Sequence, residues 1–492
     1  MTTDESHALQ TTLATDTGPH PQRLKGNMGT TDVVFTVLAF NAPLSVVVGF
    51  VPVIIGFGNQ LGAPVTFLAA GALILLFAVG FTTMSRHLPN PGAFYAYITA
   101  GLGREVGLGG AFLALYSYIF ILIGGYAFGG IAVNSLVHEV LGGPDIPWWA
   151  WVLVLQGIAG TLGYFKIDLS AKILTALMCG ELIIVAIWDA VILVNGGPEG
   201  HPATSFTTGS IFSGSVGLAI LFGVTCFSGF EATAIFREEV RDPEKTIPRA
   251  TYIAIVAMAG MYALATYVLI TGYGPSMVVD ATSADPTGSV TASFRAYLGT
   301  VAVDAVTLLL CTSIFAANLA THNVTARYLY SLSVDGVFTR HLGAVHRKHG
   351  SPHRASMITS AISVIFLVGL ALANLPATTL YATLVGIGGY ALIMLLLLTS
   401  IAVIPYFMRH RPEGVLMHPW KMLIAPTLAT LGLTAALYLA TDNVTALTGQ
   451  TATVSYTVLA LAYVAFVVGV VTAAVLRRRR PQVYARIGRQ DI

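Results

Sequence analysis

The sequence predicts an all-α integral membrane protein. Of its 492 residues, 55% are hydrophobic and only 10% are Asp, Glu, Lys or Arg, whereas soluble domains carry about 25% charged residues. The mean hydropathy is +0.76. The apolar residues also gather in stretches of about 20, the length that a helix needs to cross a bilayer. We therefore expect a multi-pass protein of the cell membrane, with the lipid bilayer as its surroundings.

Twelve stretches are long and apolar enough to be membrane-spanning helices. They lie at 32–57, 62–86, 107–137, 147–165, 171–194, 214–238, 250–273, 301–330, 354–374, 379–407, 420–440 and 452–476. The loops between them are short, so no soluble domain is inserted.

The basic residues predict that both ends of the chain lie in the cytosol. Lys and Arg collect in cytosolic loops. With the N-terminus inside, 24 of the 25 Lys and Arg residues fall on that side, and only Arg295 does not. We expect a cytosolic tail over 1–30, a domain of twelve spans over 31–476 and a basic cytosolic tail over 477–492.

The composition argues against several classes of protein. The formal net charge is only +2 and the basic residues form no broad groove, so nucleic acid is not expected as a partner. The sequence contains no phosphate-binding Gly–Lys–Ser/Thr loop, no catalytic constellation and no metal-ligand spacing. We therefore expect no enzyme activity, no cofactor and no metal. The three cysteines all lie inside apolar segments and are expected to be buried free thiols.

Two of the predicted spans contain interruptions near their middle. The first span carries the sequence NAPLS at 41–45, about 10 residues or roughly 15 Å from its start. Pro43 has no backbone N–H and disfavours helix at the residue before it. The sixth span carries TCFSGFE at 225–231, where Gly229 permits unusual backbone angles. Two ordinary kinks are one explanation; paired interruptions in matching spans are typical of the binding sites of secondary transporters.

Several motifs follow these interruptions. The sixth span continues from SGFE at 228–231 to EEVRDPEKTIPRA at 238–250, and PNPGAFYAY stands at 89–97. The sequence ARYLY at 326–330 precedes Asp335-Gly336 and Pro352. In these motifs, and along nearly its whole length, the chain resembles the amino acid–polyamine–organocation permeases.

The resemblance implies a leucine-transporter-like architecture, in which spans 1–5 and 6–10 form inverted repeats and two further helices are peripheral. It also implies that span-1 amides hold a substrate carboxylate and that span-6 carbonyls hold its amino group, because helix N-termini favour anions and C-termini favour cations. The predicted substrate-binding residues are Ala42, Pro43, Leu44, Ser45, Val46, Phe227, Ser228, Gly229 and Phe230. Many relatives have a Gly-Ser-Gly-type break in span 1; the different sequence here leaves open whether the ligand carries an α-carboxylate.

Two acids lie inside predicted spans. Glu181 is about 10 residues into the fifth span, near the bilayer midplane, where an unpaired carboxylate is costly. We expect it to be a proton-carrying or cation-facing group that couples transport; the alternative is a neutral Glu bonded to a neighbouring helix. We expect Glu231 to support the span-6 break by accepting from freed N–H groups, and Phe227 and Phe230 to gate the ligand.

The sequence therefore predicts a secondary active transporter that moves an amino acid or related amine across the cytoplasmic membrane by alternating access, coupled to protons. A polyamine or biogenic-amine carrier and an amino-acid exchanger are alternatives. A non-transporting nutrient sensor with the same fold is a rival from another class.

Overall fold

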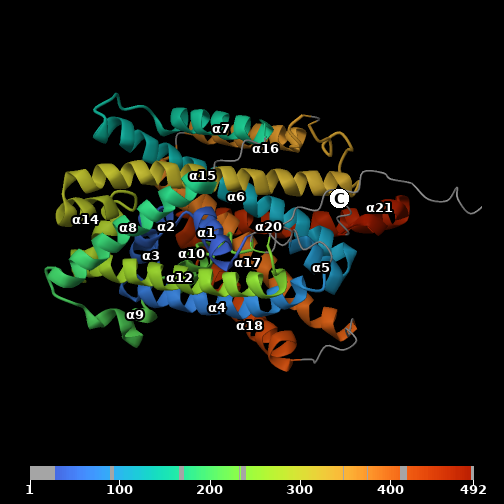
Figure 1. Cartoon of the computed structure of the whole chain (residues 1–492), viewed down its shortest axis with the longest axis horizontal. Coiled ribbons are helices and arrows are strands. Elements are labelled where there is room, and N and C mark those ends of the chain that lie inside the picture. Colours follow the sequence, from blue (N-terminus) through green and yellow to red (C-terminus); the bar gives the residue numbers. More distant parts are fainter. Residues whose placement is uncertain are drawn as a thin grey trace, which may run out of the picture.

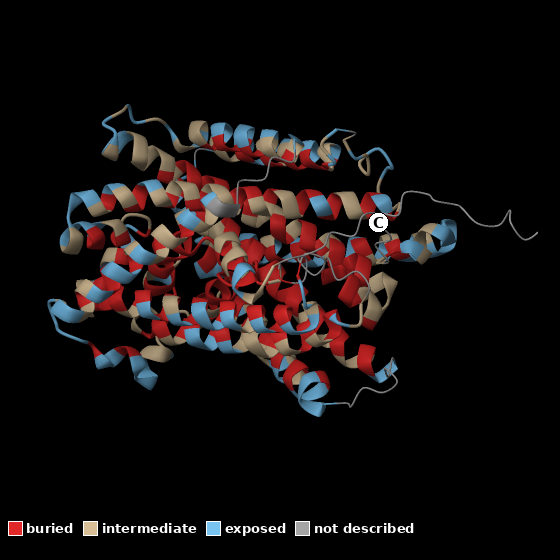
Figure 2. Ribbon diagram, viewed as in Figure 1, coloured by how far each residue is buried: buried red, intermediate tan, exposed pale blue. Residues whose placement is uncertain are grey.

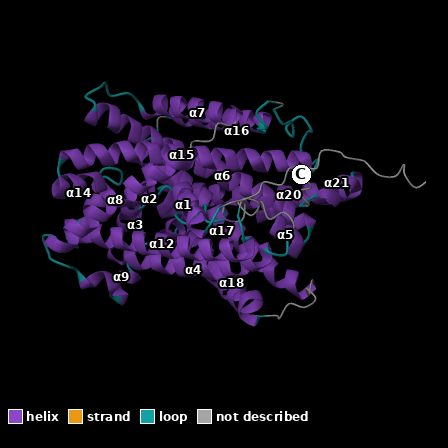
Figure 3. Cartoon of the chain, in the orientation of Figure 1, coloured by secondary structure: helices purple, strands orange, loops and turns teal. Residues whose placement is uncertain are grey.

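The computed structural model describes residues 28–88, 94–165, 171–231, 233, 240–346, 348–373, 375–409 and 418–488. Within these ranges the regular structure is helical, without a β-strand (Figure 3). The N-terminal tail as far as residue 27, the first five residues of the motif at 89–97 and most of 232–239 lie outside the described residues.

The helices follow one another along the chain with short connections. They are α1 (Thr30–Asn41), α2 (Pro43–Gly49), α3 (Val51–Phe57), α4 (Ala63–Ser85), α5 (Phe94–Leu102), α6 (Arg104–Ser135), α7 (Trp148–Phe165), α8 (Ala171–Asn195), α9 (Thr208–Ile211), α10 (Val216–Thr225), α12 (Pro243–Tyr273), α13 (Val278–Ala284), α14 (Ser289–Leu298), α15 (Thr300–Val334), α16 (His353–Leu372), α17 (Ala377–Arg409), α18 (Ala425–Asp442), α19 (Val444–Thr448), α20 (Ala452–Arg479) and α21 (Pro481–Arg486). Short 3₁₀ and π segments lie at Gln60–Gly62, Leu136–Val140, Ala203–Phe206 and Trp420–Ile424.

Ten helical stretches among the described residues are long and apolar enough to cross a membrane. Two of the twelve predicted spans are not among them. The stretch 147–165 forms α7, a helix of 18 residues that includes three tryptophans and Gln156. The stretch 214–238 forms α10, which is only 10 residues long because the helix ends at the predicted interruption. The chain is thus an all-helical, multi-pass membrane protein.

The long helices run side by side along the longest axis of the molecule (Figure 1). Helix α6 packs against α17, α20 and α15, and α12 packs against α4. Helices α7 and α16 form one edge of the view and α18 lies at the opposite edge, while α1, α2 and α10 lie between them. Buried residues concentrate in this middle region, and the outer helices carry exposed ones (Figure 2). Exposed apolar side chains on the outer helices, such as Ile365 and Val467, are suited to contact with lipid.

The first span is interrupted between α1 and α2. Its connecting residue Ala42 has φ 54° and ψ 70°, a left-handed conformation that costs a non-glycine residue about 1–2 kcal/mol. Pro43 follows at the first position of α2, where its missing N–H is not needed and its fixed φ suits a helix start. The local sequence thus ends one helix and begins the next in mid-span.

The C-terminal helix α21 is tied to the start of α6. The Glu105 carboxylate accepts from Arg477 at 3.1 Å and from the Tyr484 hydroxyl at 2.8 Å. The guanidinium of Arg104 lies 5.5 Å from the Tyr484 ring centroid and donates to Ala485 O at 3.3 Å. These contacts hold the first part of the predicted basic tail against the bundle.

Candidate functional site

The two interrupted helices meet at the side chain of Asn41, the last residue of α1. Its Nδ2 donates to Cys226 O at 2.8 Å and to Ser228 O at 2.9 Å, both in the turn that follows α10. Its Oδ1 accepts from the hydroxyl of Tyr262 on α12. One amide therefore joins the span-1 break, the span-6 break and α12 through contacts across more than 180 residues of sequence.

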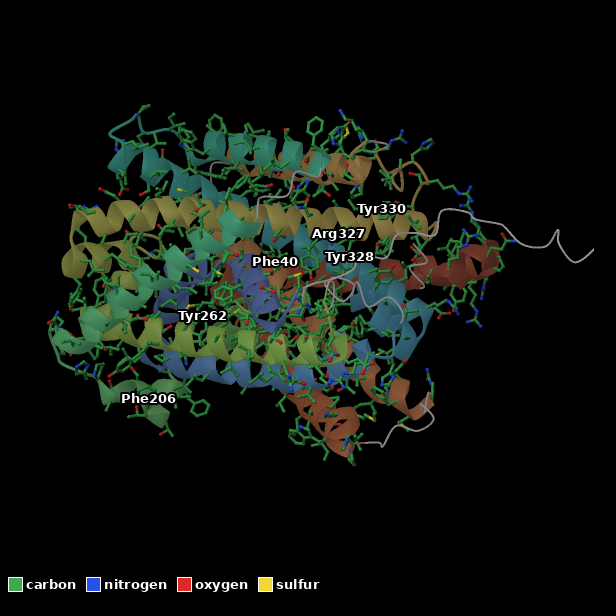
Figure 4. The ribbon with its side chains drawn as sticks, viewed as in Figure 1. Phe40, Phe206, Tyr262, Arg327, Tyr328 and Tyr330 are labelled. Carbon is green, nitrogen blue, oxygen red and sulfur yellow. The ribbon has the colours of Figure 1, made fainter. Side chains whose placement is uncertain are left out.

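A cavity of about 100 Å³ lies beside this junction. Its wall comes from α1, α2, α6, α10, the turn after α10, α15 and α17. Phe40, Phe50 and Phe128 supply aromatic surface; Figure 4 places Phe40 in the centre of the bundle, near Tyr262. The polar part of the wall includes Asn318 and Thr321 of α15. The cavity thus has the mixed apolar and polar lining of a small-molecule site.

Three of the nine predicted substrate-binding residues line this cavity, and six do not. Ser45, Val46 and Ser228 are in its wall. Pro43 instead faces a second, much smaller cavity of about 10 Å³, which Glu181 also lines. The other residues with no surface on the larger cavity are Ala42, Leu44, Phe227, Gly229 and Phe230.

The span-1 amides that the resemblance assigns to a carboxylate already have partners within the protein. Ala42 N donates to Leu38 O at 3.1 Å, and Ser45 N and Val46 N both donate to Ala42 O, at 3.0 and 3.4 Å. Leu44 N donates to the Glu181 carboxylate at 3.2 Å. A carboxylate of the protein therefore occupies the start of α2, where the resemblance places a carboxylate of the substrate.

Glu181 lies between the span-1 break and α15. It is only 4% exposed, and its Oε2 accepts from Leu44 N and, at 2.9 Å, from the Ser313 hydroxyl of α15. The partial positive charge at the start of α2 favours an ionised carboxylate at this position, while burial opposes it. The acid predicted for coupling thus contacts two elements of the site region.

Gly229 opens the span-6 break. Its φ is 105°, in the region that favours glycine, and a Cβ added there would lie 2.6 Å from Cδ1 of Phe40. The Gly229 N–H donates to Glu231 Oε2 at 2.8 Å, and Tyr118 of α6 donates to Glu231 Oε1 at 2.9 Å. Glu231 thus accepts from one N–H of the break and from one hydroxyl of α6, and its role in supporting the break stays a prediction.

The two phenylalanines predicted as gates do not line the cavity. Phe230 packs against Phe77 and Phe81 of α4, at ring-centroid distances of 5.8 and 6.2 Å. Phe227 packs against Tyr262 at 6.2 Å. Both side chains are fully buried, so in this arrangement they contribute packing, and gating by them stays a prediction.

Phe50 and Phe128, which line the cavity, belong to a cluster of four aromatic residues. Phe50 lies 6.0 Å from Phe222 and 6.1 Å from Tyr381, and Tyr381 stacks on Phe128 at 4.9 Å. The Tyr381 hydroxyl donates to Gly49 O at 2.8 Å. We call Phe50, Phe128, Phe222 and Tyr381 the aromatic roof. Under the predicted topology this roof lies on the external side.

Sequence reasoning missed several residues that the structure brings to the site. Asn41 is the first residue of the predicted span-1 interruption at 41–45. Its polar side chain directly before Ala42-Pro43 could have indicated a role at the break. Asn318 is 4% exposed and its Nδ2 has no hydrogen-bond partner; an isolated Asn in an apolar span is the kind of signal that marks a functional position. The residues described contain no group of three His, Cys, Asp or Glu placed to hold a metal.

Comparison with known proteins agrees with this architecture. The chain is 26% identical over 312 residues to the low-affinity putrescine importer PlaP of Escherichia coli (strain K12), a match that covers 61% of this chain and 66% of the importer. It is 24% identical over 372 residues to the amino-acid permease RocC of Bacillus subtilis, a match that covers 72% of this chain and 74% of that permease. It is 26% identical over 324 residues to the lysine-specific permease LysP of Lactococcus lactis, a match that covers 62% of this chain and 61% of that permease. The matches to the importer and to the lysine permease thus span slightly less than two thirds of those proteins.

A family model extends the relationship over most of the sequence. The model that describes amino acid permeases matches residues 32–481. This match includes both interrupted spans, α8 with Glu181, and the helices that line the cavity. The chain therefore belongs to the amino acid permease family.

Proposed function

We propose that this protein is a secondary active transporter that carries an amino acid or a related amine across the cytoplasmic membrane by alternating access. The observation that carries the proposal is the junction at Asn41, where two interrupted helices meet beside a cavity in the middle of the bundle. Interrupted helices of this kind provide the substrate sites of many secondary transporters. The names of the relatives, which include amino acid permeases and a putrescine importer, support the same class.

Transport is tested with purified protein in liposomes. We expect concentrative uptake of at least one labelled amino acid or amine when a pH gradient, inside alkaline, is imposed. The rival, a nutrient sensor, would bind the ligand without moving it. Saturable binding together with uptake no faster than in empty liposomes would reject the transporter and favour the sensor.

For the coupling step, the proposal assigns the proton to Glu181. Its contacts with Leu44 N and Ser313 connect α8 to α2 and α15, so a change in its charge alters the forces between these elements. A proton carrier needs a proton affinity that differs between the two access states. Exchange of one solute for another remains the alternative; it predicts uptake that requires internal substrate and ignores the pH gradient.

The proposed topology has twelve spans, with spans 1–5 and 6–10 as inverted repeats and two peripheral helices. The tails at 1–30 and 477–492 are cytosolic and flank the transporter domain at 31–476. The distribution of Lys and Arg supports this orientation. Single cysteines placed near Arg295 and near Lys245 test it: an impermeant thiol reagent added to intact cells should label the first and spare the second.

A further inference from the structure

Around the cavity, the backbone hydrogen-bond donors are already used, whereas several acceptors still have a free lone pair. A backbone N–H has one hydrogen to give, whereas a carbonyl oxygen has two lone pairs. In the span-1 break, every N–H from Ala42 to Val46 is already donated, Pro43 having none. In the span-6 break, the N–H groups of residues 226–230 donate to Phe222 O, Val224 O, Thr225 O, the Glu231 carboxylate and Phe227 O. Neither break has a spare backbone donor at these positions.

The acceptors at the same place do have spare capacity. Among the described residues, Cys226 O and Ser228 O each accept one hydrogen, from Asn41, at 2.8 and 2.9 Å, which leaves each oxygen a second lone pair. An ammonium group can therefore share these two oxygens without displacing Asn41. A carboxylate in the span-1 break would first have to displace Glu181 or open the helix start.

Three hydroxyls in the wall are also available only as acceptors. Ser45, Thr225 and Thr321 donate their hydrogens to backbone carbonyls of their own chain segments, at 2.6, 2.7 and 2.9 Å. Each hydroxyl oxygen then offers its lone pairs to a ligand. The Ser228 hydroxyl and the Asn318 amide supply three neutral donor hydrogens, but no Lys or Arg among the described lining residues offers a charge to pair with a carboxylate.

The surroundings favour a cation as well. Phe40, Phe50 and Phe128 line the cavity, and aromatic rings attract ammonium groups that lie over their faces. The carboxyl groups of Glu181 and Glu231 lie directly behind the two breaks, hydrogen-bonded to Leu44 N and Gly229 N. None of the lining residues that the structure describes is Asp, Glu, Lys or Arg, so no basic side chain of the wall repels a cation.

We propose that the ligand of this cavity is an organic amine cation that binds without an α-carboxylate. This inference rests on the proposed function, because it names the substrate class of the same site. The spare acceptors at Cys226, Ser228 and Thr321 hold the ammonium, and the aromatic side chains surround the hydrocarbon part.

Pairs of compounds that differ only by a carboxylate test this inference. Putrescine is ornithine without its carboxylate, and cadaverine is lysine without its carboxylate. Each of the four is titrated against the purified full-length protein, with thermal unfolding as the readout, since a ligand of the folded state raises the apparent stability. We expect each amine to reach half-saturation at a concentration about tenfold or more below that of its amino acid.

The outcomes separate this inference from the transporter itself. Equal binding of the two members of each pair, tighter binding of the amino acids, or no shift with either amine would overturn the inference. Uptake into proteoliposomes is measured in parallel. If an amine binds but is not transported, the proposed transport function is rejected and the inferred ligand class stands. If an amino acid is transported and outcompetes its amine, the transport function stands and the inferred ligand class is rejected.

A matched pair of variants tests the acceptor wall directly. Thr321→Val removes an oxygen that lines the cavity, and we expect it to weaken putrescine binding by about tenfold. Thr325→Val is the control. Thr325 is one turn further along α15, is fully buried, makes the same type of bond to Thr321 O at 2.8 Å, and does not line the cavity. Equal putrescine affinity in the two variants would overturn the assignment of Thr321 as an acceptor for the ligand.

Discussion

The two interrupted spans use different residues to break the helix and to bond the backbone groups that the break frees. At the span-1 break, Pro43 and a left-handed Ala42 separate the helices, and the freed groups are taken up by nearby backbone and by Glu181. At the span-6 break, Gly229 turns the chain, and the carbonyls of Cys226 and Ser228 remain directed at Asn41. Both breaks have used their backbone donors, but two carbonyls of the second break accept, among the described residues, from Asn41 alone. The difference teaches that a proline break can satisfy its polar groups within its own span and with one acid, whereas a glycine turn can leave carbonyls for a side chain of another helix.

The largest effect is expected at Gly229. Gly229→Leu should abolish transport while leaving membrane insertion largely intact, because the side chain would need a positive φ and would collide with Phe40. Uptake per inserted protein is the measurement. Gly260→Leu on α12 is the control, since a Cβ at Gly260 meets nothing within 4 Å. Wild-type uptake by a well-expressed Gly229→Leu protein would mean that the span-6 break is not part of the site.

The connection between the breaks is tested at Asn41. Asn41→Leu removes both bonds to the span-6 carbonyls and leaves them without a donor, so uptake should fall by about tenfold to a hundredfold. Tyr262→Phe removes only the bond to Asn41 Oδ1 and should cost less than Asn41→Leu. If Tyr262→Phe lowered uptake more than Asn41→Leu, Asn41 would not be the link between the breaks.

The role of Glu181 is tested by separating coupling from exchange. Glu181→Gln keeps the shape of the side chain and fixes it in a neutral form, so exchange of labelled for unlabelled substrate should persist while uptake no longer responds to an imposed pH gradient. Asp189→Asn, which changes a buried acid on the same helix, should keep the response. A Glu181→Gln protein that concentrates substrate like wild type would place coupling elsewhere; complete loss of binding would place Glu181 in the substrate site.

The smallest effect is expected far from both breaks. Arg477→Ala removes the ion pair with Glu105 near the C-terminus, where the Arg477 side chain is 68% exposed. Exposed pairs contribute about 0.2–1 kcal/mol, so the unfolding temperature should change little and uptake should stay near wild type. If Arg477→Ala lowered uptake as much as Asn41→Leu, the region around Arg477 and Glu105 would be a third functional region besides the two breaks.

The interruptions could be predicted because their causes are local. A proline in mid-span removes a hydrogen bond of its own helix, and a glycine in an apolar run permits a turn that other residues resist. The bridge from Asn41 to Cys226 could not be predicted, since the two residues are 185 positions apart. The contact of Glu181 with Leu44 N depends in the same way on how α8 packs against α2. The number of spans was also harder to predict, because α10 is cut short by the same glycine-containing turn that marks the site.

The aromatic roof has a consequence for the membrane as a whole. A secondary transporter works in a bilayer whose ion gradients store energy for the cell, and any continuous water path through the protein would discharge them. The rings of Phe128 and Tyr381 stack on each other, and the Tyr381 hydroxyl donates to Gly49 O, so bulky apolar groups of the kind that exclude water stand beside the cavity. A Cβ at Gly49 would lie 2.5 Å from the Phe128 ring, so even one methyl group there would require this ring to shift. The absence of a side chain at Gly49 therefore leaves the Phe128 ring the room that it needs to stack on Tyr381.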